Sequence, residues 1–215
     1  MNTYFAPRRV LASLDWEHTS LSDHFRLKAS LLGQFDLSDE ELNSQYLAVK
    51  MTMPFSGLTF DLGGCFELIQ QSGTHIAYAA EAGLSWISQM YGLSFLARHS
   101  SGVSDSVTAF LPITTVTQGE ILSERLSGLT VFSLDYTARL HETFSLSIIP
   151  AYFIDNFNSD WGLMGGEIYG KLNWSPASDI LVSLGGGAFL PSLGNTAPDG
   201  KTFWKAELNV IVSFF

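Results

Sequence analysis

Residues 25–37 read FRLKASLLGQFDL, and their apolar and polar side chains alternate almost one by one. Hydrophobic residues occupy most of the odd positions from Phe25 to Leu37, whereas Arg26, Lys28 and Asp36 occupy even positions. Successive side chains of a β-strand point to opposite faces. The stretch therefore predicts a strand with one apolar face and one polar face.

Composition limits the class of protein. The 215 residues suit a single domain, 46% of them are hydrophobic and only 15% are charged, where roughly 25% charged residues are usual in soluble proteins. No uninterrupted apolar run reaches the roughly 18 residues of a transmembrane helix. Two classes remain, a soluble β-protein with a large core and a membrane barrel whose apolar residues alternate with interior-facing ones. The net charge of −10 excludes a nucleic-acid-binding surface.

Alternation recurs along the whole chain. We expect eleven strands, at residues 9–16, 25–37, 46–53, 58–68, 76–86, 91–98, 130–140, 144–154, 163–174, 180–190 and 202–214. The sixth is expected to continue, with a bulge, to about residue 110, before an irregular stretch at 112–127. Strands of roughly 9–11 residues cross a bilayer, and soluble strands average nearer 5–6. Strand length therefore favours a membrane barrel.

Aromatic residues near the segment ends would form its interfacial girdle; they are Trp16, Trp86, Tyr91, Tyr152, Trp161, Trp174 and Trp204.

The last twelve residues, WKAELNVIVSFF, alternate apolar and polar positions and end in Phe215. This segment resembles the carboxy-terminal signal strand of bacterial outer-membrane proteins. The resemblance implies recognition by the barrel-assembly machinery, a location in the bacterial outer membrane among its lipids, and a periplasmic terminus. Residues 141–143 and 175–179 then become periplasmic turns, and residues 112–127 and 191–200 become external loops. We therefore predict a transmembrane antiparallel up-and-down β-barrel of 10–12 strands, monomeric and forming one domain over residues 1–215.

The start of the chain does not fit this location as it stands. Single-chain bacterial barrels usually have an even number of strands, so eleven segments indicate a missing first strand or a miscounted one. Met1-Asn2-Thr3-Tyr4 lacks the charged and apolar regions of a signal peptide. Because an outer-membrane protein must be exported, we expect Met1 to begin a processed chain or to follow a missing start.

Charged residues on the polar side of the strands would face the interior. We expect a narrow interior, in which these side chains pair and largely fill the space. They are Lys28, Lys50, Asp61, Glu67, Glu81, Arg98, Asp135, Glu167, Lys171 and Lys205. The histidines show no metal-ligand spacing, so we expect neither a metal nor a cofactor.

One short segment could support catalysis. His99 and Ser101 are two residues apart, so in a strand they would share the lipid-facing side, where a histidine could take the hydroxyl proton as the serine attacks an ester. Asp105 is the nearest candidate to orient that base. The segment resembles the His-x-Ser element of outer-membrane phospholipase A and of lipid A deacylase barrels, which implies His99 as base and Ser101 as nucleophile. Those enzymes carry Asn where this chain has Gly102. The plainer interpretation is a polar bulge or rim loop.

Three functions remain open from the sequence. The first is an outer-membrane barrel with a structural or surface role, or a narrow channel. The second is a lipid-ester hydrolase that uses the His99–Ser101 pair. The third is a soluble β-barrel that binds a small apolar ligand.

Overall fold

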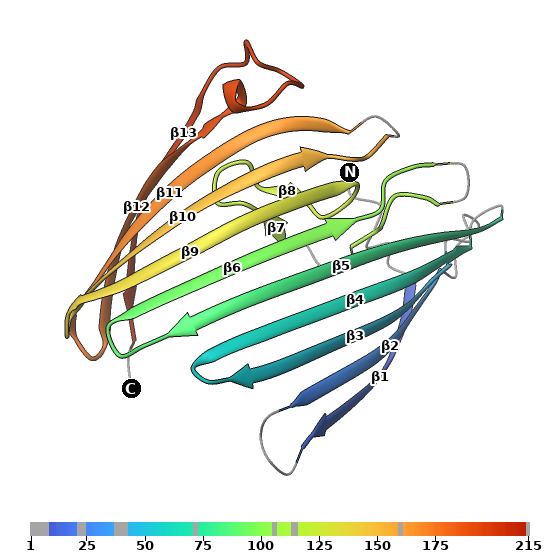
Figure 1. Cartoon of the computed structure of the whole chain (residues 1–215), viewed down its shortest axis with the longest axis horizontal. Coiled ribbons are helices and arrows are strands. Elements are labelled where there is room, and N and C mark those ends of the chain that lie inside the picture. The colour runs from blue at the N-terminus through green and yellow to red at the C-terminus, as the bar shows by residue number, and fades with distance from the viewer. Residues whose placement is uncertain are drawn as a thin grey trace.

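The structure, a computed structural model, describes residues 9–20, 25–36, 43–70, 73–104, 107–112, 116–158 and 161–213. Figure 1 shows long, tilted strands laid side by side in one curved sheet. The strands of this sheet are β1 (Arg9–Thr19), β2 (Arg26–Asp36), β3 (Asn43–Phe55), β4 (Leu58–Gln70), β5 (Thr74–Ile87), β6 (Tyr91–Ser100), β9 (Leu129–His141), β10 (Phe144–Asp155), β11 (Gly162–Ala177), β12 (Ile180–Leu190) and β13 (Phe203–Val212). No helix among the described residues is long and apolar enough to cross a membrane.

The sheet is an antiparallel meander in which each strand pairs with the next along the chain. Among the strands of the described residues, only β7 (Thr117–Gln118) and β8 (Glu124–Arg125) stand outside it, as a separate two-stranded ladder. The prediction of ten to twelve antiparallel strands is confirmed, with eleven in the sheet. Since eleven is odd, β1 and β13 run in the same direction. Within the described ranges, β1 pairs with β2 alone and β13 with β12 alone, so these two strands are the edges of the sheet.

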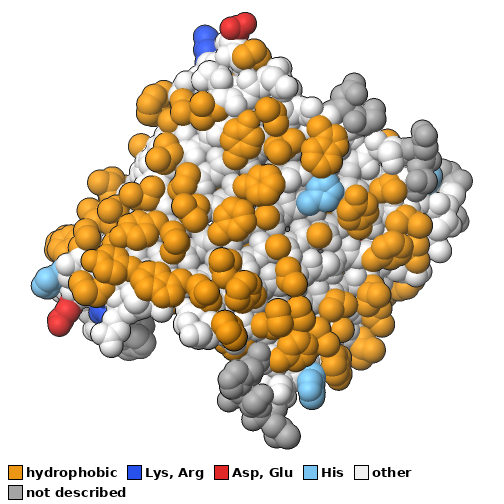
Figure 2. All heavy atoms as spheres, in the orientation of Figure 1, with side chains coloured by type: hydrophobic (Ala, Val, Ile, Leu, Met, Phe, Trp, Pro, Cys, Tyr) orange, Lys and Arg blue, Asp and Glu red, His pale blue; other side chains and the backbone are white. Residues whose placement is uncertain are grey.

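The pairing register assigns every side chain to a face, because residues paired across strands lie on the same side of a sheet. One row runs from Phe60 through Leu84 and Phe95 to Leu134, and all four are large exposed hydrophobic residues. Figure 2 shows such side chains covering much of the outward face. A soluble sandwich would bury these residues between its layers. The structure therefore does not support the soluble alternative.

The other face, which we call the inner face, carries the polar positions of the strands and is partly covered by the chain between β6 and β9. In Figure 1 the short strands β7 and β8 lie behind β6 and β9, within the curve of the sheet. We call the described residues 107–112 and 116–128 the inner segment. Residues 112–127 were expected to form an external loop. Their described part folds against the inner face, and the side of the membrane from which it enters stays a prediction.

The extension of β6 to residue 110 is wrong, since the strand ends at Ser100. The chain then turns inward, and the backbone N–H of Phe110 returns to donate to the carbonyl of Ser101 at 3.0 Å. Val107 forms a parallel bridge with Ile76 of β5. These contacts satisfy the backbone groups that would otherwise pair in a continued β6.

Candidate functional site

All ten predicted pore-lining residues lie on the inner face. The register pairs Lys28 with Lys50, and Glu81 with Arg98, on this side. The remaining positions follow by alternation along the same strands and their partners, namely Asp61, Glu67, Asp135, Glu167, Lys171 and Lys205. Their placement agrees with the sequence pattern, while their role in a pore stays a prediction.

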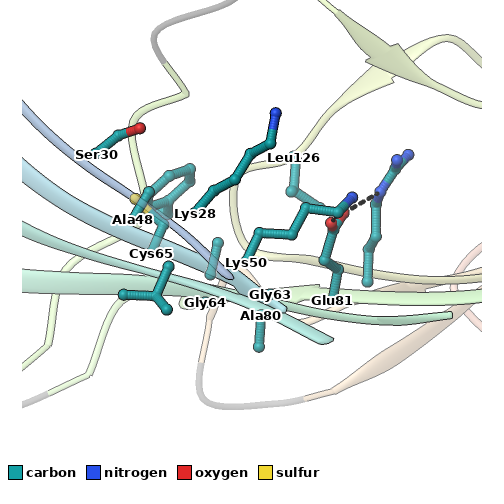
Figure 3. Close-up of a pocket in the computed structure, with 14 residues that line it drawn as sticks. Lys28, Ser30, Ala48, Lys50, Gly63, Gly64, Cys65, Ala80, Glu81 and Leu126 are labelled. Atoms are coloured by element: carbon teal, nitrogen blue, oxygen red, sulfur yellow. Dashed lines mark hydrogen bonds and ion pairs between the residues drawn. The ribbon is translucent and has the colours of Figure 1, made fainter. Parts of the chain in front are cut away.

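An inner pocket of about 370 Å³ gathers several of these charges. Lys50 Nζ lies 2.8 Å from Glu81 Oε1, and Arg98 Nε lies 3.4 Å from Glu81 Oε2. Figure 3 shows Lys50 and Glu81 pointing toward one another, with Lys28 on the same side of the sheet. Lys28 also pairs with Glu17 of β1 at 3.0 Å. Three cationic side chains and one carboxylate line the pocket, so its own walls carry a local charge of +2.

Glu167 fastens the inner segment to β11. Its carboxylate accepts three backbone N–H groups, from Glu120 at 2.7 Å and from Ile121 and Leu122 at 3.1 Å each. The side chain is almost fully buried, with 3% of its surface exposed. Hydrogen bonds to an ionised acceptor are stronger than neutral ones, and three on one carboxylate fix its position. The carbonyl of Glu120 also accepts a hydrogen bond from Lys205 Nζ at 2.9 Å.

A second buried carboxylate holds the other end of the inner segment, on β4. Glu67 Oε2 accepts the backbone N–H of Leu111 at 2.9 Å, and the Tyr46 hydroxyl donates to the Leu111 carbonyl at 3.1 Å. Between the two ends, Arg98 Nη1 donates to Gln118 Oε1 at 2.7 Å. The inner segment is thus attached to the sheet at β3 and β4, at β6, and at β11 and β13. It crosses the interior from one side to the other.

Apolar contacts accompany these hydrogen bonds. Ile121 and Leu122 pack against a buried cluster that includes Val131, Phe153 and Phe189 of three different strands. At the other end, Phe110 joins a buried cluster with Tyr46, Ile69 and Ala77. Burying a large aliphatic side chain contributes on the order of 1.5–3 kcal/mol. The inner segment is therefore packed onto the sheet as well as hydrogen-bonded to it.

His99 and Ser101 form hydrogen bonds with different partners and not with each other. His99 Nδ1 lies 2.7 Å from Thr130 Oγ1, whereas Ser101 Oγ donates to the Thr108 carbonyl at 2.8 Å and accepts the Tyr78 N–H at 3.0 Å. Ser101 is also buried, with 3% of its surface exposed. Asp105 lies outside the described residues. The arrangement gives Ser101 a structural role at the end of β6 and brings no histidine to its hydroxyl.

The resembling enzymes carry Asn at the position of Gly102. In this chain, close backbone packing around residue 102 requires glycine. A Cβ atom at this position would collide with the backbone carbonyls of Asn156 and Phe157. The Val103 N–H also donates to the Phe157 carbonyl at 2.6 Å. At Gly102 the chain leaves the sheet in close contact with the residues that follow β10. A larger residue at this position would prevent that contact.

Several members of the site were not predicted. The sequence singled out Glu67 and Glu167 as lining residues but not as anchors, and it gave no role to Tyr46 or Gln118. One sequence feature could have indicated these contacts. The irregular stretch follows strands rich in inner-face charges, and its backbone N–H and C=O groups need hydrogen-bond partners. Across the described ranges, no three His, Cys, Asp or Glu side chains are arranged to hold a metal ion.

Comparisons with known proteins identify the fold. No family model matches the sequence, and no curated protein matches it. Among solved structures, the Pseudomonas aeruginosa OccK11 (OpdR) structure aligns with a TM-score of 0.60 at 10% identity, over 96% of this chain and 58% of that one. A second structure, from work on the mechanism behind the in-meso crystallization of membrane proteins, aligns with a TM-score of 0.38 at 12% identity, over 94% of this chain and 81% of that one. This structural similarity is too weak to support an inference. The chain thus has the fold of an outer-membrane β-barrel and spans little more than half the length of OccK11.

Proposed function

We propose that the chain forms a narrow channel of the bacterial outer membrane, constricted by the inner segment. The observation that carries this proposal is the attachment of that segment across a charged interior, between Glu67 on one side and Glu167 on the other. A purely structural barrel would have no need to hold a segment in this position. The fold that the chain shares with the OccK11 (OpdR) structure is compatible with this proposal.

Such a channel has water on the inner face and lipid on the outward face. The charged pairs of Lys50, Glu81 and Arg98 would remain hydrated along the interior, while the outward hydrophobic residues would contact acyl chains. Recognition of the terminal strand by the barrel-assembly machinery belongs to this proposal.

The proposal also requires that the edges of the sheet be paired in the membrane. An unpaired backbone group costs several kcal/mol in hydrocarbon, and a spanning strand edge carries many of them. The outer strands β1 and β13 must therefore find partners when the channel forms, either in each other or in further strands.

Planar-bilayer recording of the purified, refolded chain tests the proposal. We expect discrete conductance steps that are small, since the inner segment occupies the interior. A heat-unfolded sample of the same preparation is the control for detergent artefacts. Folded protein that inserts into the bilayer and remains silent at all applied voltages would refute the channel and favour a structural or surface role.

A further inference from the structure

The outward face of the sheet carries a hollow of about 620 Å³. Small residues form its floor where β4, β5 and β6 adjoin, namely Gly64, Ala80, Ala82 and Ala97. Large residues border it, among them Leu62 and Phe132. Figure 2 shows a paler area of backbone and small side chains among the large orange side chains of this face.

Two rows of paired residues line the hollow. In one row of the register, Gly64 pairs with Ala80 and Ala80 with His99; in the next, Leu62 pairs with Ala82 and Ala82 with Ala97. The lining extends from Leu27 of β2 to Thr130 and Phe132 of β9, whereas the floor of small residues covers three adjacent strands, or two spacings of about 4.8 Å each. Two rows of one face are separated by only about 7 Å along the strands. A floor of this size suits a segment of a single hydrocarbon chain.

A polar group marks one end of the hollow. The His99 ring stacks on Trp161, with centroids 5.8 Å apart, and lies 5.7 Å from the Tyr78 ring. It belongs to the penultimate residue of β6, close to the strand end from which the inner segment departs. Aromatic residues such as Trp and Tyr prefer the level of lipid headgroups. The hollow therefore joins an apolar floor to an amphipathic end.

Hydrogen bonds fix the tautomer of His99. Asn156 Nδ2 donates to the Ser100 carbonyl at 2.6 Å, so its Oδ1 faces Thr130 and accepts the Thr130 hydroxyl proton at 2.9 Å. Because a hydroxyl has only one proton, Thr130 Oγ1 must accept from His99 Nδ1. In a neutral imidazole, Nε2 then carries a lone pair. Nε2 is then the ring nitrogen that can accept a hydrogen bond from an external donor.

We propose that this hollow binds one chain of a membrane lipid whose polar part donates an N–H or O–H to Nε2 of His99. The inference rests on the proposed outer-membrane location, because there the hollow is continuous with the lipid-facing surface. The apolar floor selects an acyl chain, and the histidine selects the chemistry of the headgroup. Lipid is the occupant rather than a protein because the hollow lies within the hydrocarbon-facing side chains of the strands.

Two lipids with identical acyl chains provide the probes. The folded chain is incorporated into vesicles of phosphatidylethanolamine, which has N–H donors, and phosphatidylcholine, which has none, and retained lipid is counted by native mass spectrometry. We expect one retained phosphatidylethanolamine per chain, with a preference of about three- to tenfold over phosphatidylcholine from one hydrogen bond. Equal retention of both lipids, or retention of neither, would overturn the proposal.

Substitutions separate the two ends of the site. The Ala80→Leu and Ala97→Leu changes fill the floor and should abolish retention of both lipids, whereas His99→Phe preserves an aromatic ring beside Trp161 and should remove only the preference. Ala206→Leu makes the same change on the outward face of β13, away from the hollow, and should alter neither. Unchanged retention in the filled variants would overturn the proposal.

Further measurements keep the outcomes distinct. Heat-modifiable gel migration verifies that each variant folds, and His99→Phe remains informative if a leucine variant does not. A dimer that the leucine substitutions disrupt would overturn the proposal in favour of a second copy as the occupant. Channel conductance is recorded separately, since loss of lipid retention with intact conductance would refute this inference and leave the channel proposal standing.

Discussion

Replacing Glu167 by glutamine should release the inner segment and open the channel. In the structure this carboxylate accepts the backbone N–H groups of Glu120, Ile121 and Leu122. A glutamine carbonyl oxygen can retain the two bonds made by Oε2. Its NH₂ group, however, would face the Glu120 N–H, donor against donor. The substitution therefore removes one hydrogen bond, leaves one buried N–H unsatisfied and weakens the other two bonds.

The size of the effect follows from these contacts. A hydrogen bond to a charged group contributes about 1.5–3 kcal/mol, and an unsatisfied buried donor costs about 1–3 kcal/mol, with partial overlap between the two. A net loss of roughly 3 kcal/mol would shift the equilibrium between attached and detached segment by about a hundredfold. The packing of Ile121 and Leu122 against the sheet remains and opposes complete release.

Single-channel recording measures the outcome. We expect Glu167→Gln to show a higher mean conductance and frequent transitions between levels, as the segment moves off the inner face and back. Asp61→Asn is the matched control, since it also removes one carboxylate from the inner face but its oxygen bonds to Thr52, at 2.6 Å, and not to the inner segment. Identical conductance and noise in Glu167→Gln and wild type would refute the assignment of the inner segment as the constriction.

Three further predictions concern the same region. Lys50→Gln should lower the anion-to-cation permeability ratio by about twofold, because one of three cations is lost from the inner pocket; a reversal potential in a salt gradient that does not move would contradict this. Ser101→Ala should leave lipid-ester hydrolysis at its background level and should lower the free energy of unfolding by about 1–2 kcal/mol, because the Tyr78 N–H loses its partner; hydrolysis by wild type that the variant lacks would restore the hydrolase hypothesis. Gly102→Ala should lower the free energy of unfolding by about 1–3 kcal/mol in a urea titration, because a Cβ would collide with the Asn156 carbonyl; unchanged stability would show that the chain adjusts there.

The strands could be predicted because their signal is local. Alternation assigned each position to a face, and the boundaries expected for residues 180–190 coincide with β12. Those for residues 144–154 differ from β10 by a single residue at the end. Turn residues such as Glu142 and Thr143, within the turn expected at residues 141–143, separated the strands without any knowledge of pairing. The fold class followed from length, period and the absence of a long apolar run.

The candidate site could not be predicted in the same way, because its contacts are distant in sequence. Glu167 binds the N–H of Ile121 across 46 positions, and neither residue's neighbours indicate the other. Ser101 illustrates a second reason. Its spacing from His99 suggests a shared face only while β6 continues, and the strand ends at Ser100. Beyond that point the Ser101 hydroxyl turns to the backbone of Tyr78 and Thr108, and the expected pairing with His99 is not formed.

Spin labels on β5 test most directly whether the two faces of this sheet meet lipid and water. Leu84 and Ser85 are neighbours, and exposure alternates from position to position along this part of the strand. Each is replaced by a labelled cysteine in a chain whose native Cys65 is changed to serine, and accessibility is measured in vesicles to oxygen and to a water-soluble nickel complex. Oxygen should dominate at Leu84 and nickel at Ser85. The opposite assignment, or equal accessibility of both positions to nickel, would contradict a lipid-facing outer surface.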